Sequence, residues 1–454
     1  MADTPALDRL KTAVFADYTA RTPKSHALWE RGKSVLPGGV SGNLRYFAPY
    51  PLYMGTGSGS RTIDVDGNAY IDCFSCNGPL MLGHRPAAVL EAIERHRDMG
   101  PLVLNPALLV ECAELLASIV PCAEKVRFLN SGTEAVLSAV RYARAFTGRD
   151  KVVKFLGHYH GQSDAFLVGL TPDRHPFGAG VPASAHEDVL TLPFNDIAAF
   201  EALVTGRSDI AAVLLDPAMH SGGLWGASPD FLRAVRRATA ACGIILIFDE
   251  VITGFRLGLA GAQGHYGVTP DLATFAKALA AGEKLGAVAG RADVMAVTDP
   301  LAATCVPRAF QSGTGNDGTA ALAAAIGAMT EYQRQDAEGG YAALDTAAAD
   351  CAATLVSAFV AHGIPLHVNR MASMMQLFIT DAPASFARYA ALRTDLVELF
   401  YLALINHGVM LSLPTSNHVY FSFAHQAADF AAIAEAVATV LRTYPFAEAY
   451  QELA

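Results

Sequence analysis

The stretch GIILIFDEVITGFRLG, from Gly243 to Gly258, places an apolar run directly before two adjacent carboxylates, Asp249 and Glu250. A short run of Ile, Leu and Phe is typical of a strand that is buried on both faces of a parallel sheet. Burying a charge without a partner is costly, so we expect at least one of these carboxylates to meet a cation at the end of the strand. The stretch therefore predicts a parallel sheet with a polar site at its edge.

Alternating helix and strand patterns surround this stretch, from about Asn105 to Gly290. KVVKF at 151–155 and IAAVLL at 210–215 have the composition of short buried strands. The segment from Ser131 to Thr147, which precedes the first of these strands, has helical periodicity. Gly148 follows it, and glycine commonly ends helices. The repeated alternation predicts an α/β fold with a mostly parallel central sheet covered by helices.

Capping residues predict where two further helices begin. Asn195 precedes a helical pattern with Ile197, Phe200, Leu203 and Val204 on one face, and we expect Asn195 to cap it. Ser228 and Pro229 are typical of a cap and a first helical residue, and Gly243 is expected to end that helix. In open parallel sheets ligands bind at the carboxyl ends of the strands, where Asp249 is expected.

The two ends of the chain have different patterns from its centre. RTIDV and NAYID flank Asp66-Gly67, which is a typical hairpin turn, and the chain after about Gln335 contains long Ala-rich helices. We therefore expect a smaller α+β domain built from both chain ends. The predicted division is residues 1–75 for the N-terminal segment and part of the small domain, 76–334 for the large domain and 335–454 for the C-terminal small domain.

The composition excludes several classes of partner and compartment. The 454-residue chain is 52% hydrophobic and 17% charged, with a formal charge of -10 and no Lys/Arg cluster, so neither nucleic acid nor an anionic membrane is expected as a partner. The N-terminus lacks the apolar core of a signal peptide, and no apolar run approaches membrane-spanning length. Seven scattered cysteines favour reduced thiols in a cytoplasmic enzyme, and the C-x-x-C of Cys73 and Cys76 is interpreted as structural.

Two segments that follow strands carry polar and aromatic residues. FLNSGTEAV at 128–136 leads into a helix through Asn-Ser-Gly-Thr, which can cradle a phosphate or simply cap the helix, and capping is the usual reason for such a pattern. FLGHYHGQS at 155–163 presents Tyr159 between two histidines, and no further His or Cys cluster completes a metal site. Tyr159 can cover a planar ring or pack in the core, and its own segment favours neither.

Lys277 lies in the segment PDLATFAKALAAGEKLGAVAGR, between small and apolar residues. Such flanks predict a partly buried lysine, whose pKa is lowered and whose amine is therefore more nucleophilic. A lysine, a phosphate cradle, a ring cover and a buried carboxylate together form the set of groups that holds pyridoxal 5'-phosphate. The lysine would form the Schiff base, and Asp249 would keep the pyridine nitrogen protonated. This pyridinium is the cation that we expect at the end of the strand.

At this point the sequence resembles the class III, fold type I aminotransferases, a family that includes glutamate-1-semialdehyde aminomutase and β-amino-acid aminotransferases. The resemblance covers nearly the whole chain, and its motifs occur in the family's order. They are LPGGVSGNLRYF, DVDGNAYID, NSGTEA, YHG, FDEVITGFR, AKALAAG and SGTGND.

The resemblance implies a role for residues of several motifs. Lys277 would carry the cofactor, Asp249 would pair with its pyridine nitrogen and Tyr159 would stack on its ring. Glu250 would be a structural carboxylate or one that supports a residue in contact with the cofactor. The phosphate would be received by Ser131, Gly132 and Thr133, and by Thr314 from the neighbouring subunit. The enzyme would then be a homodimer with active sites at the interface.

This chain departs from the family pattern at several positions. Asp216 stands where a Glu is usual, so a carboxylate near the cofactor is shorter, and Asp317-Gly318 replaces the usual Pro. Asn77 occupies the place of the aminomutase's Trp in the substrate pocket. Arg45 is aligned with the arginine that binds a substrate carboxylate, whereas HVYFSFAH at 418–425 lacks the arginine that many members use for an α-carboxylate.

The leading hypothesis is an aminotransferase that moves an amino group from an amine or amino acid, including β- or γ-amino carboxylates, to an oxo acid such as pyruvate or 2-oxoglutarate. The alternative is an aminomutase of the glutamate-1-semialdehyde type, which moves the group within one molecule. A racemase or decarboxylase on the same scaffold ranks below both. A nicotinamide-dependent dehydrogenase is disfavoured because no G-x-G-x-x-G opens the first helix, and a non-catalytic binding protein is disfavoured by Lys277 and Asp249.

Overall fold

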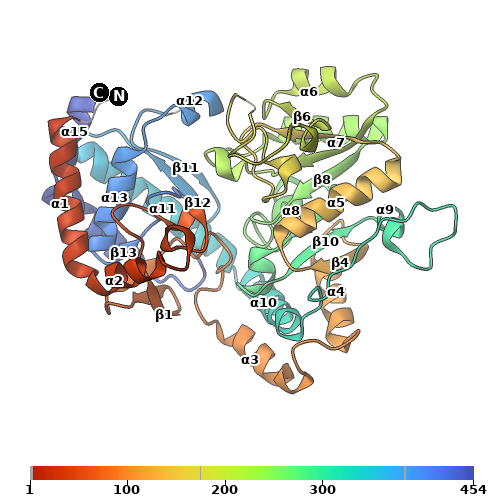
Figure 1. The fold of residues 1–454 in the computed structure, drawn as a ribbon, viewed down its shortest axis with the longest axis horizontal. Helices are drawn as coiled ribbons and strands as arrows, with labels where there is room; N and C mark the ends of the chain where they lie inside the picture. The colour runs from red at the N-terminus through yellow and green to blue at the C-terminus, as the bar shows by residue number, and fades with distance from the viewer. Residues whose placement is uncertain (1–3, 174, 383–384, 454) are drawn as a thin grey trace. The chain divides into compact units, whose positions relative to one another are not determined.

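The computed structural model describes residues 4–173, 175–382 and 385–453, which fall into two compact units (Figure 1). Both chain ends belong to unit 1. Unit 1 comprises Met1–Pro86, Ala342–Ala384 and Ala391–Ala454, and unit 2 comprises Ala87–Tyr341 and Ser385–Ala390. The large unit thus begins later and extends further than the predicted range 76–334, and it includes a short segment from the C-terminal part of the chain.

A seven-stranded sheet forms the centre of unit 2. Strand β10 is antiparallel to both of its neighbours, β4 and β9, whereas every other neighbouring pair is parallel. The predicted α/β fold with a mostly parallel sheet is therefore confirmed. The strand order across the sheet is β4 (Lys125–Leu129), β10 (Gly286–Gly290), β9 (Leu272–Phe275), β8 (Ile245–Asp249), β7 (Ile210–Leu215), β5 (Lys151–Phe155) and β6 (Val189–Leu192).

Helices pack on both faces of this sheet. Helix α5 (Gly132–Thr147) buries one face in a cluster that includes Leu214 and Ile247, residues of neighbouring strands. On α7, Phe231 contacts Phe155 of β5 edge to face, with ring centroids 5.3 Å apart. The other helices of unit 2 are α3 (Ala87–His96), α4 (Ala107–Ile119), α6 (Ile197–Val204), α7 (Pro229–Cys242), α8 (Gly261–Tyr266), α9 (Ala292–Met295), α10 (Thr319–Ala337) and α12 (Phe386–Ala390).

The capping residues of α5 and α7 act as their sequences predict. Ser131 caps α5 by accepting from the backbone N–H of Glu134, and Gly148 ends the helix in the left-handed region. Helix α7 has the same arrangement with Ser228 at its start and Gly243 at its end. These signals are local, so they specify helix boundaries without help from the rest of the fold.

The predicted cap of α6 is wrong by one residue. Asp196, not Asn195, accepts from the backbone N–H of Ala199. Asn195 instead adopts a φ of 62° and its side-chain carbonyl accepts from the N–H of Ser228 at 2.8 Å. Asn tolerates the left-handed region, so it turns the chain while the following Asp caps the helix.

Two smaller sheets and several helices form unit 1. The first sheet has the order β1 (Met54–Ser58), β2 (Arg61–Asp64), β3 (Ala69–Asp72) and β13 (Val409–Met410), and β2 and β3 form the predicted hairpin around Asp66-Gly67. The second sheet has the order β11 (His367–Met371), β12 (Met374–Phe378) and β14 (Val419–Tyr420).

The first and last helices of the chain pack together in unit 1. The N–H of Ala6 donates to Glu452 Oε2 at 2.8 Å, and Asn406 donates to the carbonyl of Val14 at 3.0 Å. These bonds join α1 to α15 and α13. The helices of unit 1 are α1 (Pro5–Arg21), α2 (Pro23–Gly32), α11 (Gly340–Ala361), α13 (Asp395–Asn406), α14 (Ala427–Thr443) and α15 (Phe446–Leu453).

By length and composition alone, helix α11 could cross a membrane. This is weak evidence for a span, because core helices pass the same test. The segment was not identified from the sequence as an apolar run of that length. The helix carries Asp345 and Asp350, and its buried residues recur every three or four positions, as they do on a helix that packs on a protein core. They are Leu344, Ala348, Cys351, Leu355 and Phe359.

All seven cysteines are free thiols. In the C-x-x-C pair, Cys73 is buried and Cys76 is exposed. Burial raises the pKa of both thiols, so both favour the unreactive protonated form. These properties support the structural interpretation of the pair.

Candidate active site

A cavity of about 230 Å³ lies in unit 2 where the strands of the large sheet end. It is built from segments that follow β4, β5, β7, β8 and β9, which the fold brings together from positions far apart in the sequence. The lining includes seven of the residues singled out from the sequence. These are Ser131, Gly132, Thr133, Tyr159, Asp216, Asp249 and Lys277.

The start of α5 forms one wall of the cavity. The first backbone N–H groups of a helix have no partner within the helix, so this end attracts anions. Close packing leaves no room for side chains nearby, since a Cβ at Gly161 would lie 2.5 Å from Thr133 Oγ1 and one at Gly286 would lie 2.4 Å from the carbonyl oxygen of Ser131. Ser131 caps α5 and also lines the cavity, so its role as a cap is compatible with the predicted phosphate cradle.

Asp249 ends β8 and is only 6% exposed. Its Oδ1 accepts from the N–H of Val251 at 3.1 Å and from Thr274 Oγ1 at 3.2 Å. Burial raises the pKa of Asp249 to about 6, and these hydrogen bonds and the charge of Lys277 oppose that rise. A buried carboxylate of this kind can hold a protonated ring nitrogen as its partner.

His160 supports Asp249 from the segment after β5, which is separated from β8 by β7 in the sheet. Its Nδ1 lies 2.7 Å from Asp249 Oδ2, and both side chains are buried. Burial lowers the pKa of His160 well below its usual range, so a neutral imidazole donates from Nδ1 to the carboxylate. The sequence interpretation considered His160 only as a metal ligand, and the described residues contain no group of three or more His, Cys, Asp or Glu that could hold a metal.

Lys277 follows β9 and begins a short 3₁₀ helix, η7 (Lys277–Ala280), with a φ of 47°. It is partly buried, as its apolar flanks predict. Burial lowers the pKa of Lys277 to about 8, and the charge of Arg256 lowers it further, whereas Asp249 and Asp216 oppose the shift. A lysine with this pKa is partly unprotonated near neutral pH and can act as a nucleophile or a base.

Asp216 follows β7 and is the second buried carboxylate of the cavity. It accepts from the backbone N–H groups of Ala218 at 3.0 Å and His220 at 3.1 Å. Burial and the neighbouring charge of Asp249 raise the pKa of Asp216 to about 7, and these hydrogen bonds and the charge of Lys277 oppose the rise. Two carboxylates and one lysine therefore share a cavity in which all three pKa values are shifted towards neutrality.

Tyr159 lies on the wall of the cavity and is 46% exposed. Burial raises the pKa of its hydroxyl. This position is not in the hydrophobic core, so of the two interpretations left open by the sequence, the structure favours an aromatic that covers a planar ring.

Three predicted site residues lie outside this cavity lining. Arg45 and Asn77 belong to unit 1, where Arg45 is exposed at the end of the short helix η2 (Asn43–Arg45) and Asn77 Oδ1 accepts from the hydroxyl of Tyr420 at 3.2 Å. Thr314 is exposed on the loop before α10. The geometry of unit 2 does not test their roles, so these roles remain predictions.

Glu250, the second carboxylate of the opening stretch, belongs to a separate buried network. It accepts from the N–H of Ala262 at 2.6 Å and from Gln263 Nε2 at 3.0 Å. A Cβ at Gly261 would lie 2.2 Å from Glu250 Oε2, so only glycine fits there. Glu250 therefore joins the end of β8 to α8 and does not line the cavity.

The groups in the cavity suit pyridoxal 5'-phosphate. The start of α5 can receive a phosphate, Asp249 can hold a proton on a pyridine nitrogen, and Lys277 can bond to an aldehyde carbon. The close approach of Gly161 and Gly286 to the α5 start keeps the cradle free of side chains.

Comparison with known proteins agrees with pyridoxal 5'-phosphate as the cofactor of this cavity. The family model described as Aminotransferase class-III matches residues 47–340. A glutamate-1-semialdehyde 2,1-aminomutase of Archaeoglobus fulgidus is 35% identical over 92% of this chain and 99% of its own length. The enzyme of the same name from Nitratidesulfovibrio vulgaris is 37% identical over 92% of this chain and 98% of its own length.

Solved structures of transaminases and of an aminomutase are also similar to this chain. An omega-transaminase from Sphaerobacter thermophilus has a TM-score of 0.85 and 34% identity, covering 92% of this chain and 97% of that one. A beta-phenylalanine aminotransferase from Variovorax paradoxus has a TM-score of 0.85 and 30% identity, covering 96% and 97%. A glutamate-1-semialdehyde-aminomutase from Pseudomonas aeruginosa PAO1, solved with PMP, has a TM-score of 0.85 and 25% identity, covering 96% and 98%.

Proposed function

Because the chain belongs to the class-III aminotransferase family, whose members bind pyridoxal 5'-phosphate, we propose that it moves an amino group on a small amino carboxylate. The observation that carries the proposal is that one cavity of unit 2 brings together Lys277, Asp249 and the start of α5. A reactive amine, a buried carboxylate and an anion cradle are needed together only when one ligand engages all three.

When bound, pyridoxal 5'-phosphate supplies an electron sink for the charge that develops on a substrate carbon. The residues of this chain bind, orient and move protons around it. The start of α5 holds the phosphate, and Tyr159 covers the ring. Asp249, oriented by His160, holds a proton on the pyridine nitrogen. Lys277 would hold the cofactor through its side-chain amine, and the same amine, when free, would move a proton at the substrate carbon.

The best-supported form of this reaction is an aminomutase reaction of the glutamate-1-semialdehyde type. Two curated relatives at 35% and 37% identity carry that name, and each covers 92% of this chain. These relatives support the intramolecular reaction better than the intermolecular one, so they reverse the order of the two hypotheses drawn from the sequence. Arg45 is proposed to hold the substrate carboxylate through its guanidinium group.

The second candidate is an aminotransferase with an amino donor and an oxo-acid acceptor. Asn77 favours it, since the aminomutase pattern has a Trp at this position, and so do the solved transaminases at 34% and 30% identity. Under either reaction we propose a cytoplasmic homodimer in which Thr314 reaches the phosphate of the neighbouring subunit.

A product analysis with the cofactor-loaded enzyme distinguishes the two reactions. Glutamate-1-semialdehyde and a panel of α-, β- and γ-amino acids are supplied without an oxo acid, and products are followed by mass. An isomer that accumulates over many turnovers without oxo product is expected for an aminomutase. One equivalent of oxo product per site, followed by arrest until an oxo acid is added, would instead establish the aminotransferase. The Lys277→Ala variant serves as the inactive control, and absence of both products would contradict the proposed function.

A further inference from the structure

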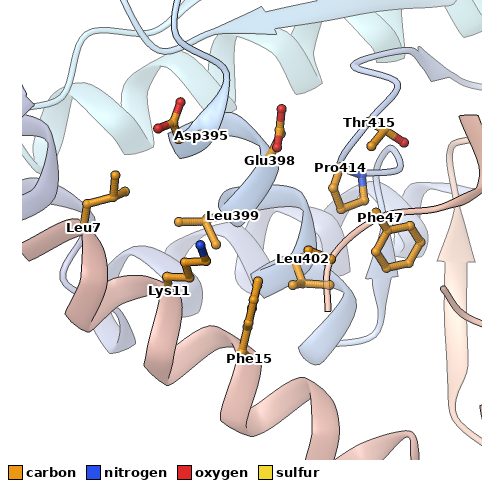
Figure 2. A pocket seen from close by; sticks show the side chains of 11 residues that line it. Leu7, Lys11, Phe15, Phe47, Asp395, Glu398, Leu399, Leu402, Pro414 and Thr415 are labelled. Carbon is orange, nitrogen blue, oxygen red and sulfur yellow. The ribbon is translucent and has the colours of Figure 1, made fainter. Parts of the chain in front are cut away.

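A second cavity, of about 210 Å³, lies within unit 1 between α1 and α13 (Figure 2). Its volume is small for a site that takes a drug-sized ligand, and it suits a molecule of amino-acid size. Most of its walls are apolar. These walls include Leu7, Phe15, Phe47, Leu399, Leu402 and Pro414.

Charged groups of both signs stand around this apolar floor. Lys11 projects from α1, and Asp395 and Glu398 project from α13 (Figure 2). Among the described residues, neither Lys11 nor Glu398 forms an ion pair within 4 Å. Glu398 accepts from the hydroxyl of Thr394 at 2.5 Å.

Asp395 differs from Glu398 because it already has a cationic partner. It forms an ion pair with Arg393, and this hydrogen bond lowers the pKa of Asp395, with a further lowering by the charge of Lys11. Lys11 therefore faces the cavity with its charge, and Glu398 is the carboxylate that has no cation of its own among the described residues.

Local structural roles explain only part of this arrangement. Negative charge is favourable in the first turn of a helix, which accounts for Asp395 and Glu398 at the start of α13. Lys11 lies over the ring of Phe15, with Nζ 5.8 Å from the centroid. Neither contact occupies the cavity itself, where a ligand would contact the largely buried side chains of Leu399 and Leu402.

We propose that this cavity binds a free amino acid with an apolar side chain. The ammonium group lies against Glu398, the carboxylate lies against Lys11, and the side chain covers the floor formed by Leu399 and Leu402. A fatty acid would satisfy Lys11 but would meet the negative charge of Glu398, and a simple amine would leave Lys11 without an anion. Only a zwitterion complements both charges and the apolar floor.

Titration calorimetry with L-leucine tests this assignment. The protein is the holoenzyme after borohydride reduction, in which the cofactor is fixed on Lys277 and amino-group exchange contributes no heat. We expect saturable binding of one leucine per chain at millimolar concentration or below. Glu398→Gln and Lys11→Met should each weaken it about two- to fivefold, because a charge contact near the surface contributes up to about this factor.

Matched variants separate this cavity from any other leucine site. Gln at position 398 can still accept from Thr394, and Met at position 11 keeps the apolar stem, so both variants should fold. Glu114→Gln and Lys24→Met change exposed charges outside the lining and should leave the affinity unchanged. Thr415→Trp, at an exposed lining position, should fill the cavity and abolish binding.

Three outcomes would overturn the proposal. The first is the absence of saturable binding to the unaltered protein at millimolar leucine. The second is equal affinity in the Glu398→Gln, Lys11→Met and control variants, which would place leucine elsewhere. The third is that 4-methylpentanoate or 3-methylbutylamine binds as tightly as leucine, which would show that one of the two charges is not used.

Discussion

The two cavities have similar volumes, but their surroundings shift the pKa of an aspartate in opposite directions. In unit 2, Asp216 and Asp249 are each 6% exposed, and burial raises the pKa of both. In unit 1, Asp395 is partly exposed, and its pKa is lowered because Arg393 supplies a partner. The same side chain, an aspartate, is thus made easier to protonate in one cavity and harder in the other.

The difference shows what converts a charged residue into a reactive one. Desolvation brings the pKa values of Asp249 and Lys277 towards neutrality, where small changes in their surroundings move protons. An exposed charge such as that of Lys11 can attract a ligand of opposite charge. We therefore expect substitutions in the first cavity to alter chemistry and those in the second to alter only binding.

Lys277→Ala should have the largest effect. Removal of the amine abolishes both covalent attachment of the cofactor and the proton transfer, so turnover should fall by at least about a thousandfold. Steady-state rates would be measured alongside cofactor content. A variant that retains near wild-type turnover would show that the buried lysine is not the reactive group.

Asp249→Asn should come next, with a loss of about a hundredfold in kcat. The amide cannot carry the negative charge that holds the pyridine proton, although its shape is nearly unchanged. Cofactor absorbance would be recorded as well, so that loss of binding is separated from loss of chemistry. Unchanged turnover with full cofactor content would remove the role assigned to Asp249.

Glu250→Gln tests how burial affects a carboxylate that does not line the active-site cavity. Burial raises the pKa of Glu250 from 4.5 to about 7, so the folded protein holds its proton more tightly than the unfolded chain. Stability should therefore fall as the pH rises between these values, by about 2 kcal/mol between pH 5 and pH 8. Urea unfolding of the apoprotein at both pH values should show that the free energy of unfolding falls less in the variant than in the unaltered protein. An equal fall in the two proteins would contradict the raised pKa of Glu250.

His160→Ala should lower kcat about tenfold, a typical loss for a group that orients another. The imidazole is proposed to act by orienting Asp249, to which it is hydrogen-bonded, so KM should change little while the pH dependence of kcat shifts. His160→Asn keeps a donor near the position of Nδ1 and should restore most of the rate. Equal losses in both variants would indicate a packing role instead.

Glu398→Gln should have the smallest effect. The free energy of unfolding should stay within about 0.5 kcal/mol of the unaltered protein, and turnover should not change, because a partly exposed charge without an ion-pair partner among the described residues contributes little. Thermal unfolding and steady-state rates would check this. A loss comparable to that of Asp249→Asn would break the distinction between the two cavities.

Local signals predicted much of the fold. Ser131 and Gly148 bound α5, and Asp66-Gly67 turns the hairpin of unit 1, as expected. These features depend on hydrogen bonds and backbone angles within a few residues. The prediction failed at Asn195 because its side chain bonds to Ser228, which is 33 residues away.

The sequence by itself determined the buried strand before Asp249, the apolar setting of Lys277 and the polar segments that follow β4 and β5. It did not determine that His160 supports Asp249, since these residues are 89 positions apart. Nor did it identify Ala262 and Gln263 as the partners of Glu250. Tertiary structure decided both, because adjacent strand residues point to opposite sides and the packing around each sets its partners and its loss of water.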